Sequence, residues 1–241
     1  MARLTYIFDV DGTLTPPRQR MTDDMIFSFL EFSKNNSYYL LTGSDSPKIR
    51  QQMPDSVLSR SDGYFTCMGN EFYEGDNLVY RNEFIAPIQL KNRLLDFKIS
   101  SSCPNKKKDY LEIRTGMVNF STLGRNCSKL ERDAYEKWDK ENGERLRIVK
   151  ELEKEFSGFE FKIGGQISID IFPRGKDKSY ALKFLQNNKS IRPKDMIYFG
   201  DKCSEKGNDY SAKIFLKRNG GKFYCVNSYQ DVKSLIGFYA K

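Results

Sequence analysis

Phe8-Asp9-Val10-Asp11-Gly12-Thr13-Leu14-Thr15 closes a short, largely apolar run that begins at Leu4 in this 241-residue chain. An apolar run that ends in a polar turn predicts a buried strand. Alternate positions on an extended chain point the same way, so the carboxylates of Asp9 and Asp11 can share one site. Two carboxylates that lie so near to each other repel. Mg²⁺, which prefers oxygen ligands, would remove that repulsion. A turn closing a strand explains one aspartate equally well, but two aspartates with a glycine and a threonine are more specific.

Three further polar signals follow predicted strands or open a predicted helix. They are Thr42-Gly43-Ser44 after the strand 38–41, Lys178 at the start of the helix 177–186, and Gly200-Asp201 after the strand 196–199, with Asn208-Asp209 a short loop later. Open parallel sheets bind ligands at the carboxyl ends of their strands. Hydroxyl groups, a lysine and a helix N-terminus favour an anion such as a phosphoryl group. Each signal alone is weak, because glycine, serine and aspartate are ordinary loop residues.

The order of predicted elements indicates an α/β fold with an insertion. Strands and helices alternate at both ends of the chain, which predicts a parallel sheet covered by helices. The middle contains two predicted hairpins, 110–121 and 159–172, with helices at 87–99, 129–140 and 144–156. We therefore expect a core domain of residues 1–82 and 176–241 with a Rossmann-like parallel sheet. Residues 83–175 would form an inserted α+β domain with an antiparallel sheet.

The inserted sheet is expected to have one apolar and one polar face. Ile167, Ile169 and Ile171 alternate with Ser168 and Asp170. Successive side chains on a strand point to opposite faces, so the isoleucines would meet the covering helices. By the same alternation, Leu111 and Ile113 would lie opposite Glu112 and Arg114. The polar face would either meet water or line a cleft.

Composition excludes several classes of function. The chain has no histidine, so Ser-His and Cys-His catalysis and histidine-ligated metals are excluded. The net charge of +8 fits an anionic small substrate better than a nucleic acid, because the one basic run is Lys106-Lys107-Lys108. No apolar run is long enough to span a membrane. The N-terminal stretch lacks the apolar segment of a signal peptide, so we expect a cytosolic protein.

The cysteines are predicted to be free thiols. Five cysteines, an odd number, are scattered along the chain and form no C-x-x-C pair. A disulfide framework or a zinc site is therefore not expected. The five positions are Cys67, Cys103, Cys127, Cys203 and Cys225.

Taken together, the motifs resemble those of the haloacid dehalogenase superfamily, and more closely those of the eukaryotic-type phosphomannomutase family. The catalytic motifs identify the superfamily, whereas motifs in the inserted domain are more specific for the family. The matching stretches are Phe8–Thr15, Pro17–Gln19, Gly43–Asp45, Gly124–Cys127, Gly164–Pro173, Asp177-Lys178, Phe199–Lys202 and Gly207–Asp209. The resemblance implies interconversion of mannose 6-phosphate and mannose 1-phosphate, with the inserted domain acting as a cap.

The resemblance also implies roles for the core residues. Asp9 would attack phosphorus and become an aspartyl phosphate, while Asp11 would act as general acid and base. Ser44 and Lys178 would neutralise the transferring phosphoryl group. The implied cofactors are Mg²⁺ and an activating hexose 1,6-bisphosphate. The implied metal site comprises Asp9, Asp11 through its carbonyl, Asp201, Asn208 and Asp209.

In the cap, arginines would bind the phosphate that is not reacting, which a mutase must hold and a simple phosphatase need not. Any one of them alone could instead form a surface ion pair of little consequence. The implied substrate-binding residues are Arg18, Arg114, Arg125, Arg132, Ser168 and Asp170. The resemblance further implies a homodimer formed through the caps.

Three departures from the family pattern concern substrate preference. Lys176 stands where the family commonly has tryptophan, and Lys206 stands where it has the first of two glycines. Gly69-Asn70, after the third strand, is similar instead to sugar phosphatases of the same superfamily. A sugar-phosphate phosphatase is therefore an alternative function. A non-catalytic sugar-phosphate-binding protein is a second alternative, against which the retained carboxylates and lysine argue.

Overall fold

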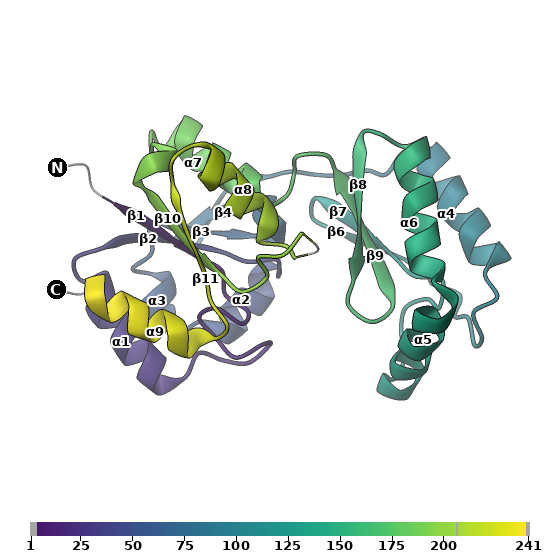
Figure 1. Ribbon diagram of the computed structural model, residues 1–241, viewed down its shortest axis with the longest axis horizontal. Helices are drawn as coiled ribbons and strands as arrows, with labels where there is room; N and C mark the ends of the chain where they lie inside the picture. Colours follow the sequence, from purple (N-terminus) through teal and green to yellow (C-terminus); the bar gives the residue numbers. More distant parts are fainter. Residues whose placement is uncertain (1–3, 206, 240–241) are drawn as a thin grey trace. The chain divides into compact units, whose positions relative to one another are not determined.

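The computed structural model describes residues 4–205 and 207–239. Lys206 and the first three residues of the N-terminal stretch considered above lie outside the described residues. The chain divides into two compact units (Figure 1), a first of Met1–Asn82 and Gly175–Lys241 and a second of Glu83–Arg174. Within the described ranges, no helix has the length and apolar character needed to cross a membrane.

The first unit is built on a seven-stranded sheet in the order β11-β10-β1-β2-β3-β4-β5. The first five strands in this order pair in parallel, whereas β4 and β5 extend the sheet as an antiparallel hairpin. The strands are β1 (Thr5–Phe8), β2 (Ser37–Leu41), β3 (Gly63–Thr66), β4 (Glu71–Glu74), β5 (Asn77–Arg81), β10 (Met196–Gly200) and β11 (Lys222–Cys225).

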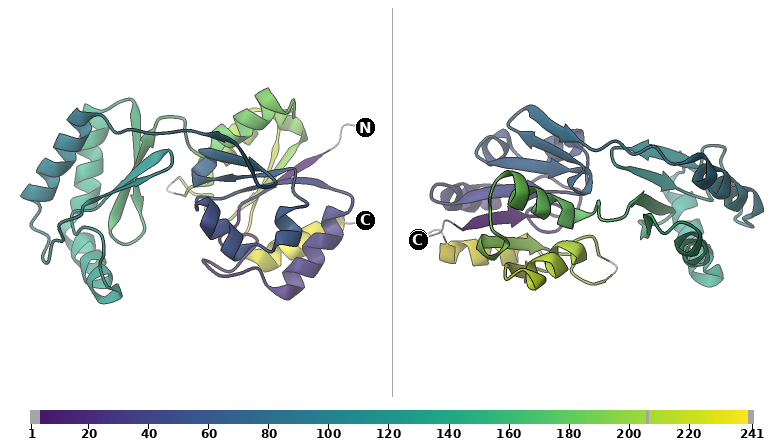
Figure 2. Two further views of the ribbon diagram at one scale, coloured as in Figure 1. Left: turned by 180° about the vertical axis from the view of Figure 1, so that it is seen from behind. Right: turned by 90° about the horizontal axis from the view of Figure 1, so that it is seen from above.

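Helices cover both faces of this sheet, as Figure 1 and the view from behind in Figure 2 show. One layer contains α1 (Asp23–Ser33), α2 (Ser46–Gln52), α3 (Asp55–Leu58) and α9 (Tyr229–Tyr239), and the other contains α7 (Lys178–Asn188) and α8 (Tyr210–Arg218). Short 3₁₀ turns lie at Cys67–Gly69 and Pro193–Asp195. Along β1, Tyr6 and Phe8 pack into the first layer and Ile7 into the second, as the period of a strand requires. Burial on both faces explains the nearly continuous apolar character of this strand.

The second unit pairs a four-stranded antiparallel sheet, in the order β6-β7-β9-β8, with three helices. Ile169 and Ile171 pack against α4 and α6 in one apolar cluster, as their alternation predicted. Ile113 differs, because it is 74% exposed despite its place on the apolar face. It lies on the edge strand β6, beyond the cluster formed by the inner strands. The elements are α4 (Ile88–Ser100), β6 (Leu111–Arg114), β7 (Met117–Phe120), α5 (Lys129–Asn142), α6 (Glu144–Glu155), β8 (Phe159–Gly164) and β9 (Ser168–Pro173).

The predicted fold class, an α/β unit with a parallel sheet and a separate α+β unit, is confirmed. The prediction of five free thiols is wrong, because Cys203 and Cys225 form a disulfide. Parallel pairing of β10 with β11 sets Gly200 beside Cys225, and the turn after Gly200 returns Cys203 to the same place. The two Cα atoms are 6.1 Å apart, within the usual range for a disulfide. Cys67, Cys103 and Cys127 are free.

Candidate active site

The predicted polar signals of the first unit meet at one edge of its sheet. Asp9 follows β1 and Asp201 follows β10, and these strands are neighbours with Phe8 paired to Phe199. The backbone N–H of Asp9 donates to the carbonyl of Phe199 at 2.9 Å. Strand β2, on the other side of β1, leads into the loop that carries Ser44. Parallel strands therefore bring residues almost 200 positions apart in the sequence to one place.

Two glycines allow the loops at this edge to approach one another. Gly12 has φ +84°, and a side chain there would collide with the carboxylate of Asp201. A side chain at Gly200 would collide with the carboxyl group of Asp209 and the ring of Tyr198. Glycine at both positions thus permits the close contact between the N-terminal loop and the turn after β10.

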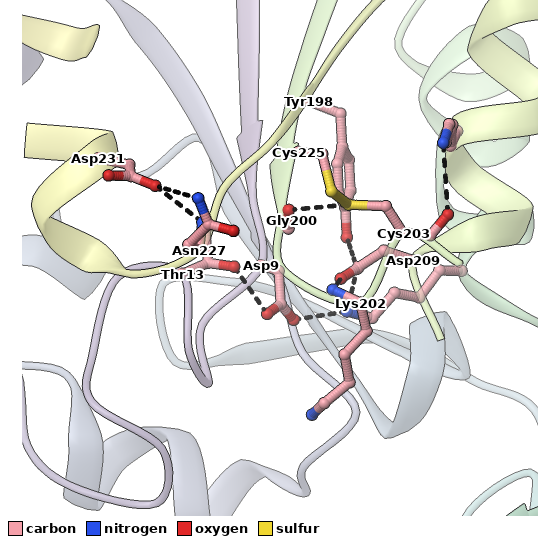
Figure 3. The surroundings of a disulfide bond; sticks show 12 residues. Asp9, Thr13, Tyr198, Gly200, Lys202, Cys203, Asp209, Cys225, Asn227 and Asp231 are labelled. Atoms are coloured by element: carbon pink, nitrogen blue, oxygen red, sulfur yellow. Dashed lines mark hydrogen bonds and ion pairs between the residues drawn. A yellow bond between two sulfur atoms is a disulfide. The ribbon is translucent and has the colours of Figure 1, made fainter. Parts of the chain in front are cut away.

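Lys178 is the centre of a buried network of charges. It is the first residue of α7 and is fully buried. Its Nζ atom donates to Oδ1 of Asp9 at 2.5 Å and to Oδ1 of Asp209 at 2.7 Å. The Oγ1 atom of Thr13 donates to the other oxygen of Asp9 at 3.1 Å, and the hydroxyl of Tyr198 donates to Asp209 at 2.6 Å (Figure 3). The carboxylates of Asp9 and Asp209 are therefore held in fixed orientations.

The network has more negative than positive charge. Burial raises the pKa of Asp9 to about 7, because the loss of hydration outweighs the opposing effect of Lys178, and the charges of Asp209 and Asp201 add to the increase. Burial opposes the charged form of Lys178, yet Asp209 and Asp9 raise its pKa above the usual range. Burial likewise opposes ionisation of Asp209, but Lys178 and further hydrogen bonds lower its pKa. One ammonium group thus contacts two carboxylates. The site therefore has less positive charge than is needed to balance its carboxylates.

A divalent cation fits this site. Ligand oxygens of Asp9, Asp201 and Asp209 lie within 4.8 Å of one another. Within the described ranges, the Oδ1 atoms of Asp201 and Asn208 are buried and have no hydrogen-bond partner. Buried oxygens without donors are costly unless a cation or water satisfies them. The donor set is entirely oxygen, which matches a hard cation.

Asp11 lies beside this cluster and has its own hydrogen-bond donors. Its Oδ1 atom accepts from the side-chain amide of Gln52 at 2.7 Å and from the backbone N–H of Arg18 at 2.7 Å. Its Oδ2 atom accepts from the Oγ atom of Ser44 at 3.3 Å. The side chain of Asp11 is therefore held by its own donors and is not one of the three clustered carboxylates.

The second unit carries a charged cluster on the polar face of its sheet. Glu112 accepts from Arg114 Nε at 2.8 Å and also pairs with Arg125. Arg125 also donates to Asn119, whose side-chain amide donates to Asp170. Burial lowers the pKa of Arg125, because the cluster withdraws its guanidinium from water. The predicted residues Arg114, Arg125 and Asp170 are thus brought together.

Two other predicted substrate residues make backbone contacts instead. The Nε atom of Arg132 donates to the carbonyl of Cys127 at 3.2 Å, and the Oγ atom of Ser168 donates to the carbonyl of Gly164 at 2.9 Å. Arg132 nevertheless lies near enough to Arg125 for its positive charge to affect the pKa of that group. Arg132 therefore borders the charged cluster.

Comparisons with known proteins place the chain in a family. A model of the eukaryotic phosphomannomutase family matches residues 27–236. A phosphomannomutase of Dendrobium officinale is 38% identical over 218 residues, which cover 87% of this chain and 84% of that one. The chain belongs to the eukaryotic phosphomannomutase family. The predicted membership is confirmed, and with it the prediction that the chain is an enzyme.

Solved structures of the haloacid dehalogenase superfamily share the fold of this family member. A haloacid dehalogenase-like hydrolase from Bacteroides thetaiotaomicron has a TM-score of 0.65 at 13% identity, covering 98% of this chain and 99% of that chain. A subclass IIB sugar phosphatase of the superfamily has a TM-score of 0.61 at 16% identity, covering 98% of each chain. At these identities the likeness shows the fold alone.

Two departures from the phosphomannomutase pattern contact each other. The side-chain amide of Asn70 donates to the carbonyl of Lys176 at 3.2 Å and to that of Cys67 at 2.9 Å. The Nζ atom of Lys176 lies 3.6 Å from the centre of the Tyr180 ring. An ammonium group over an aromatic ring replaces the indole that the family commonly has at this position.

Sequence reasoning missed several residues of this phosphomannomutase-family site. Gln52 and Tyr198 lie within a helix and a strand, where their spacing matched buried packing positions and gave no sign of a polar contact. Thr13 belongs to the N-terminal motif quoted above, so the sequence did indicate a polar residue close to Asp9. Glu112 and Asn119 were visible only as polar positions on strands.

Proposed function

We propose that the enzyme interconverts mannose 6-phosphate and mannose 1-phosphate through an aspartyl phosphate on Asp9. Membership of the phosphomannomutase family supports the reaction. The observation that carries the mechanism is the close grouping of three carboxylates, of which Asp9 and Asp209 are buried and Asp201 is half-buried. Lys178, which contacts two of these carboxylates, would stabilise the charge of a transferring phosphoryl group.

In this proposal, an oxygen of Asp9 forms a bond to phosphorus while the bond from phosphorus to the sugar oxygen breaks. Asp11 donates a proton to the departing sugar oxygen, and in the next step it removes a proton from the hydroxyl that attacks the aspartyl phosphate. The hydrogen bonds from Gln52 and Ser44 hold the Asp11 carboxylate in place for both steps. A hexose 1,6-bisphosphate supplies the first phosphoryl group.

The cation is proposed to be Mg²⁺, held by Asp9, the carbonyl of Asp11 and Asp201, with Asn208 and Asp209 supporting the loop. When bound, it supplies positive charge to the phosphoryl oxygens. The residues themselves orient the nucleophile. Thr13 and Lys178 each donate to one oxygen of Asp9, so the carboxylate cannot rotate freely.

The second unit is proposed to act as the cap and to hold the phosphate that is not reacting. The cluster around Glu112 presents two guanidinium groups, and guanidinium binds phosphate in a bidentate manner. Arg132, Ser168 and Asp170 would add contacts to this phosphate or to the sugar. Arg18, which is exposed next to Asp11, would contact the substrate from the first unit.

We also propose a cytosolic homodimer formed through the second unit, which acts on a phosphorylated hexose and binds no nucleic acid. The edge strand β6, which carries the exposed Ile113, supports the dimer, because the unpaired edge of a sheet can pair with a second chain.

The decisive experiment is an isomerisation assay with mannose 6-phosphate, Mg²⁺ and added hexose 1,6-bisphosphate. We expect mannose 1-phosphate to form, and we expect Asp9→Asn and treatment with a chelator each to abolish its formation. A parallel assay with glucose phosphates measures the sugar preference.

Other products would support the alternative functions. Release of inorganic phosphate without any sugar 1-phosphate would refute the mutase and leave a sugar-phosphate phosphatase. Binding of the sugar phosphate with no turnover, unchanged by Asp9→Asn, would instead indicate a non-catalytic binding protein.

A further inference from the structure

The disulfide joins the proposed metal-binding loop to the neighbouring strand. Cys203 lies two residues after Asp201 and is only 5% exposed. Cys225 is the last residue of β11 and is exposed. Figure 3 shows the bond beside Gly200, with Asp209 and Tyr198 close by. A covalent link therefore ends inside the loop that carries three of the residues proposed to form the metal site.

This loop is otherwise closed by a small number of hydrogen bonds. The backbone N–H of Lys202 donates to Oδ2 of Asp209 at 3.0 Å, and the N–H of Asp209 donates to the carbonyl of Lys202 at 3.1 Å. Cys203 follows Lys202 directly, so the disulfide anchors the chain next to this reciprocal pair. The Cys225 end of the disulfide is anchored as well, because the N–H of the next residue, Val226, donates to the carbonyl of Gly200 at 3.0 Å. Cleavage of the bond would leave the loop held by these hydrogen bonds and by the ion pair of Asp209 with Lys178.

The bond can be reached from one side. Thiol–disulfide exchange requires a thiolate to approach one sulfur of the disulfide. Cys225 is exposed, so an incoming thiolate can attack its sulfur, and the buried Cys203 sulfur is then the leaving group. The carbonyl oxygen of Gly200, 3.3 Å from the Cys203 sulfur, provides an acceptor for the thiol that forms.

We propose that Cys203–Cys225 is a thiol–disulfide exchange site whose oxidation state sets the metal affinity of the enzyme. The reductant is a dithiol, either a small molecule or a protein. Its first thiolate bonds to the Cys225 sulfur and releases the Cys203 thiolate, which takes up a proton. The second thiolate of the dithiol then attacks the dithiol's own first sulfur, breaks the bond to Cys225 and releases the Cys225 thiolate, which also takes up a proton. Two electrons pass to the protein, and the dithiol leaves as a disulfide.

The inference rests on the proposed function for the metal site, but not on the identity of the sugar. Disulfides that occur in reducing compartments are usually transient and redox-sensing rather than structural. Loss of groups that orient metal ligands lowers metal affinity by about 10- to 100-fold. The disulfide restrains the loop rather than a ligand itself, so we expect reduction to weaken Mg²⁺ binding by a smaller factor, roughly 3- to 10-fold.

The first test counts thiols in the full-length protein. A maleimide mass shift under denaturing conditions should show three free thiols after purification without reductant and five after treatment with a dithiol. Mg²⁺ binding is then measured by calorimetry on the oxidised and reduced forms without substrate. We expect weaker binding by the reduced form, with recovery when the disulfide is formed again.

Two substitutions separate this pair from the other cysteines. Cys225→Ser should bind Mg²⁺ as the reduced wild type does, with or without dithiol. Cys127→Ser removes a free thiol of the second unit and should keep the full redox response. Because the response of the unmodified protein is measured as well, the test does not depend on folding of the Cys225 variant.

Each contrary result has a distinct meaning. Five free thiols in the protein as purified, or equal Mg²⁺ affinity of the two forms, would overturn the exchange site and leave the metal site intact. Absence of Mg²⁺ binding by both forms would remove the metal site, and the exchange proposal with it.

Discussion

Asp9 shows how a single residue depends on the charges placed around it. It is 3% exposed, and one further carboxylate, that of Asp209, shares its lysine partner. The same burial that keeps water from the proposed nucleophile makes its ionisation costly while no cation is bound. We therefore expect the stability of the folded protein to depend on pH and on the presence of Mg²⁺.

The first prediction concerns the pH dependence of stability without Mg²⁺. The pKa of Asp9 is raised to about 7, from an ordinary value of 3.8. The folded protein thus binds this proton more tightly than the unfolded chain, and the free energy of unfolding falls as pH rises from about 4 to about 7. Asp9→Asn removes this loss. At pH 8 the variant should melt about 5 °C or more above the wild type, since 1 kcal/mol corresponds to about 2–4 °C in a chain of this size.

Thermal unfolding at several pH values checks this prediction. The difference between variant and wild type should vanish near pH 4, and saturating Mg²⁺ should reduce it at pH 8. A variant that is no more stable than the wild type at pH 8 would contradict the assigned charge balance.

The second prediction concerns Tyr198, whose hydroxyl donates to Asp209. Tyr198→Phe keeps the ring and removes one donor from a carboxylate of the proposed metal-binding loop. A hydrogen bond to a charged group is worth about 1.5–3 kcal/mol, so stability to urea should fall by about that amount. We also expect the Mg²⁺ concentration required for half-maximal activity to rise.

Tyr38→Phe is a matched control for this substitution. Tyr38 is equally buried and its hydroxyl donates to the carbonyl of Val57, which is not part of the site. This variant should lose stability without any change in Mg²⁺ dependence. An equal response of the two variants would mean that Tyr198 has only a structural role.

At the level of elements, the polar face of β6, β7 and β9 is the feature proposed to distinguish a mutase from a phosphatase. Cross-strand register places Glu112 opposite Asn119, and Asn119 opposite Asp170. Arg125, which comes from the loop after β7, completes the cluster. Glu112 holds the guanidinium groups of two arginines, and an incoming phosphate would compete with it for them.

The third prediction tests this face with Arg125→Lys. Lysine keeps the charge but cannot form the bidentate contact. Loss of one hydrogen bond to a charged group should raise the KM for the hexose phosphate by about tenfold or more. Arg93→Lys is the control, because Arg93 pairs with Glu151 and Glu155 on helices of the same unit. Steady-state kinetics should show no change for the control, and an unchanged KM for Arg125→Lys would remove the cluster from the binding site.

At the level of the whole molecule, the exposed isoleucine of β6 bears on assembly. The fourth prediction is that light scattering gives twice the 28.1 kDa mass of the chain. Ile113→Asp should shift the mass towards that of a monomer, because a charge on the edge strand disfavours association. Phe27→Asp, at an equally exposed position in α1 of the first unit, should leave the mass unchanged. A monomeric wild type at working concentration would refute the dimer.

Patterns local in the chain determined most of the architecture of this protein. The apolar run of β1, the alternation of β9 and the order of strands and helices identified the fold class, because the faces that bury apolar side chains have fixed periods. Polar residues at strand ends identified the charged edge around Asp9, because parallel strands end at a common edge.

Only the tertiary structure decided the contacts between segments that no local period links. The donors Gln52 and Tyr198 occupy ordinary helix and strand positions, and their partners lie in other loops. The disulfide between Cys203 and Cys225 depends on the pairing of β10 with β11 and on the path of the turn between them. A sequence specifies periodic burial directly, whereas a hydrogen bond or a disulfide forms only where packing brings two distant atoms within reach.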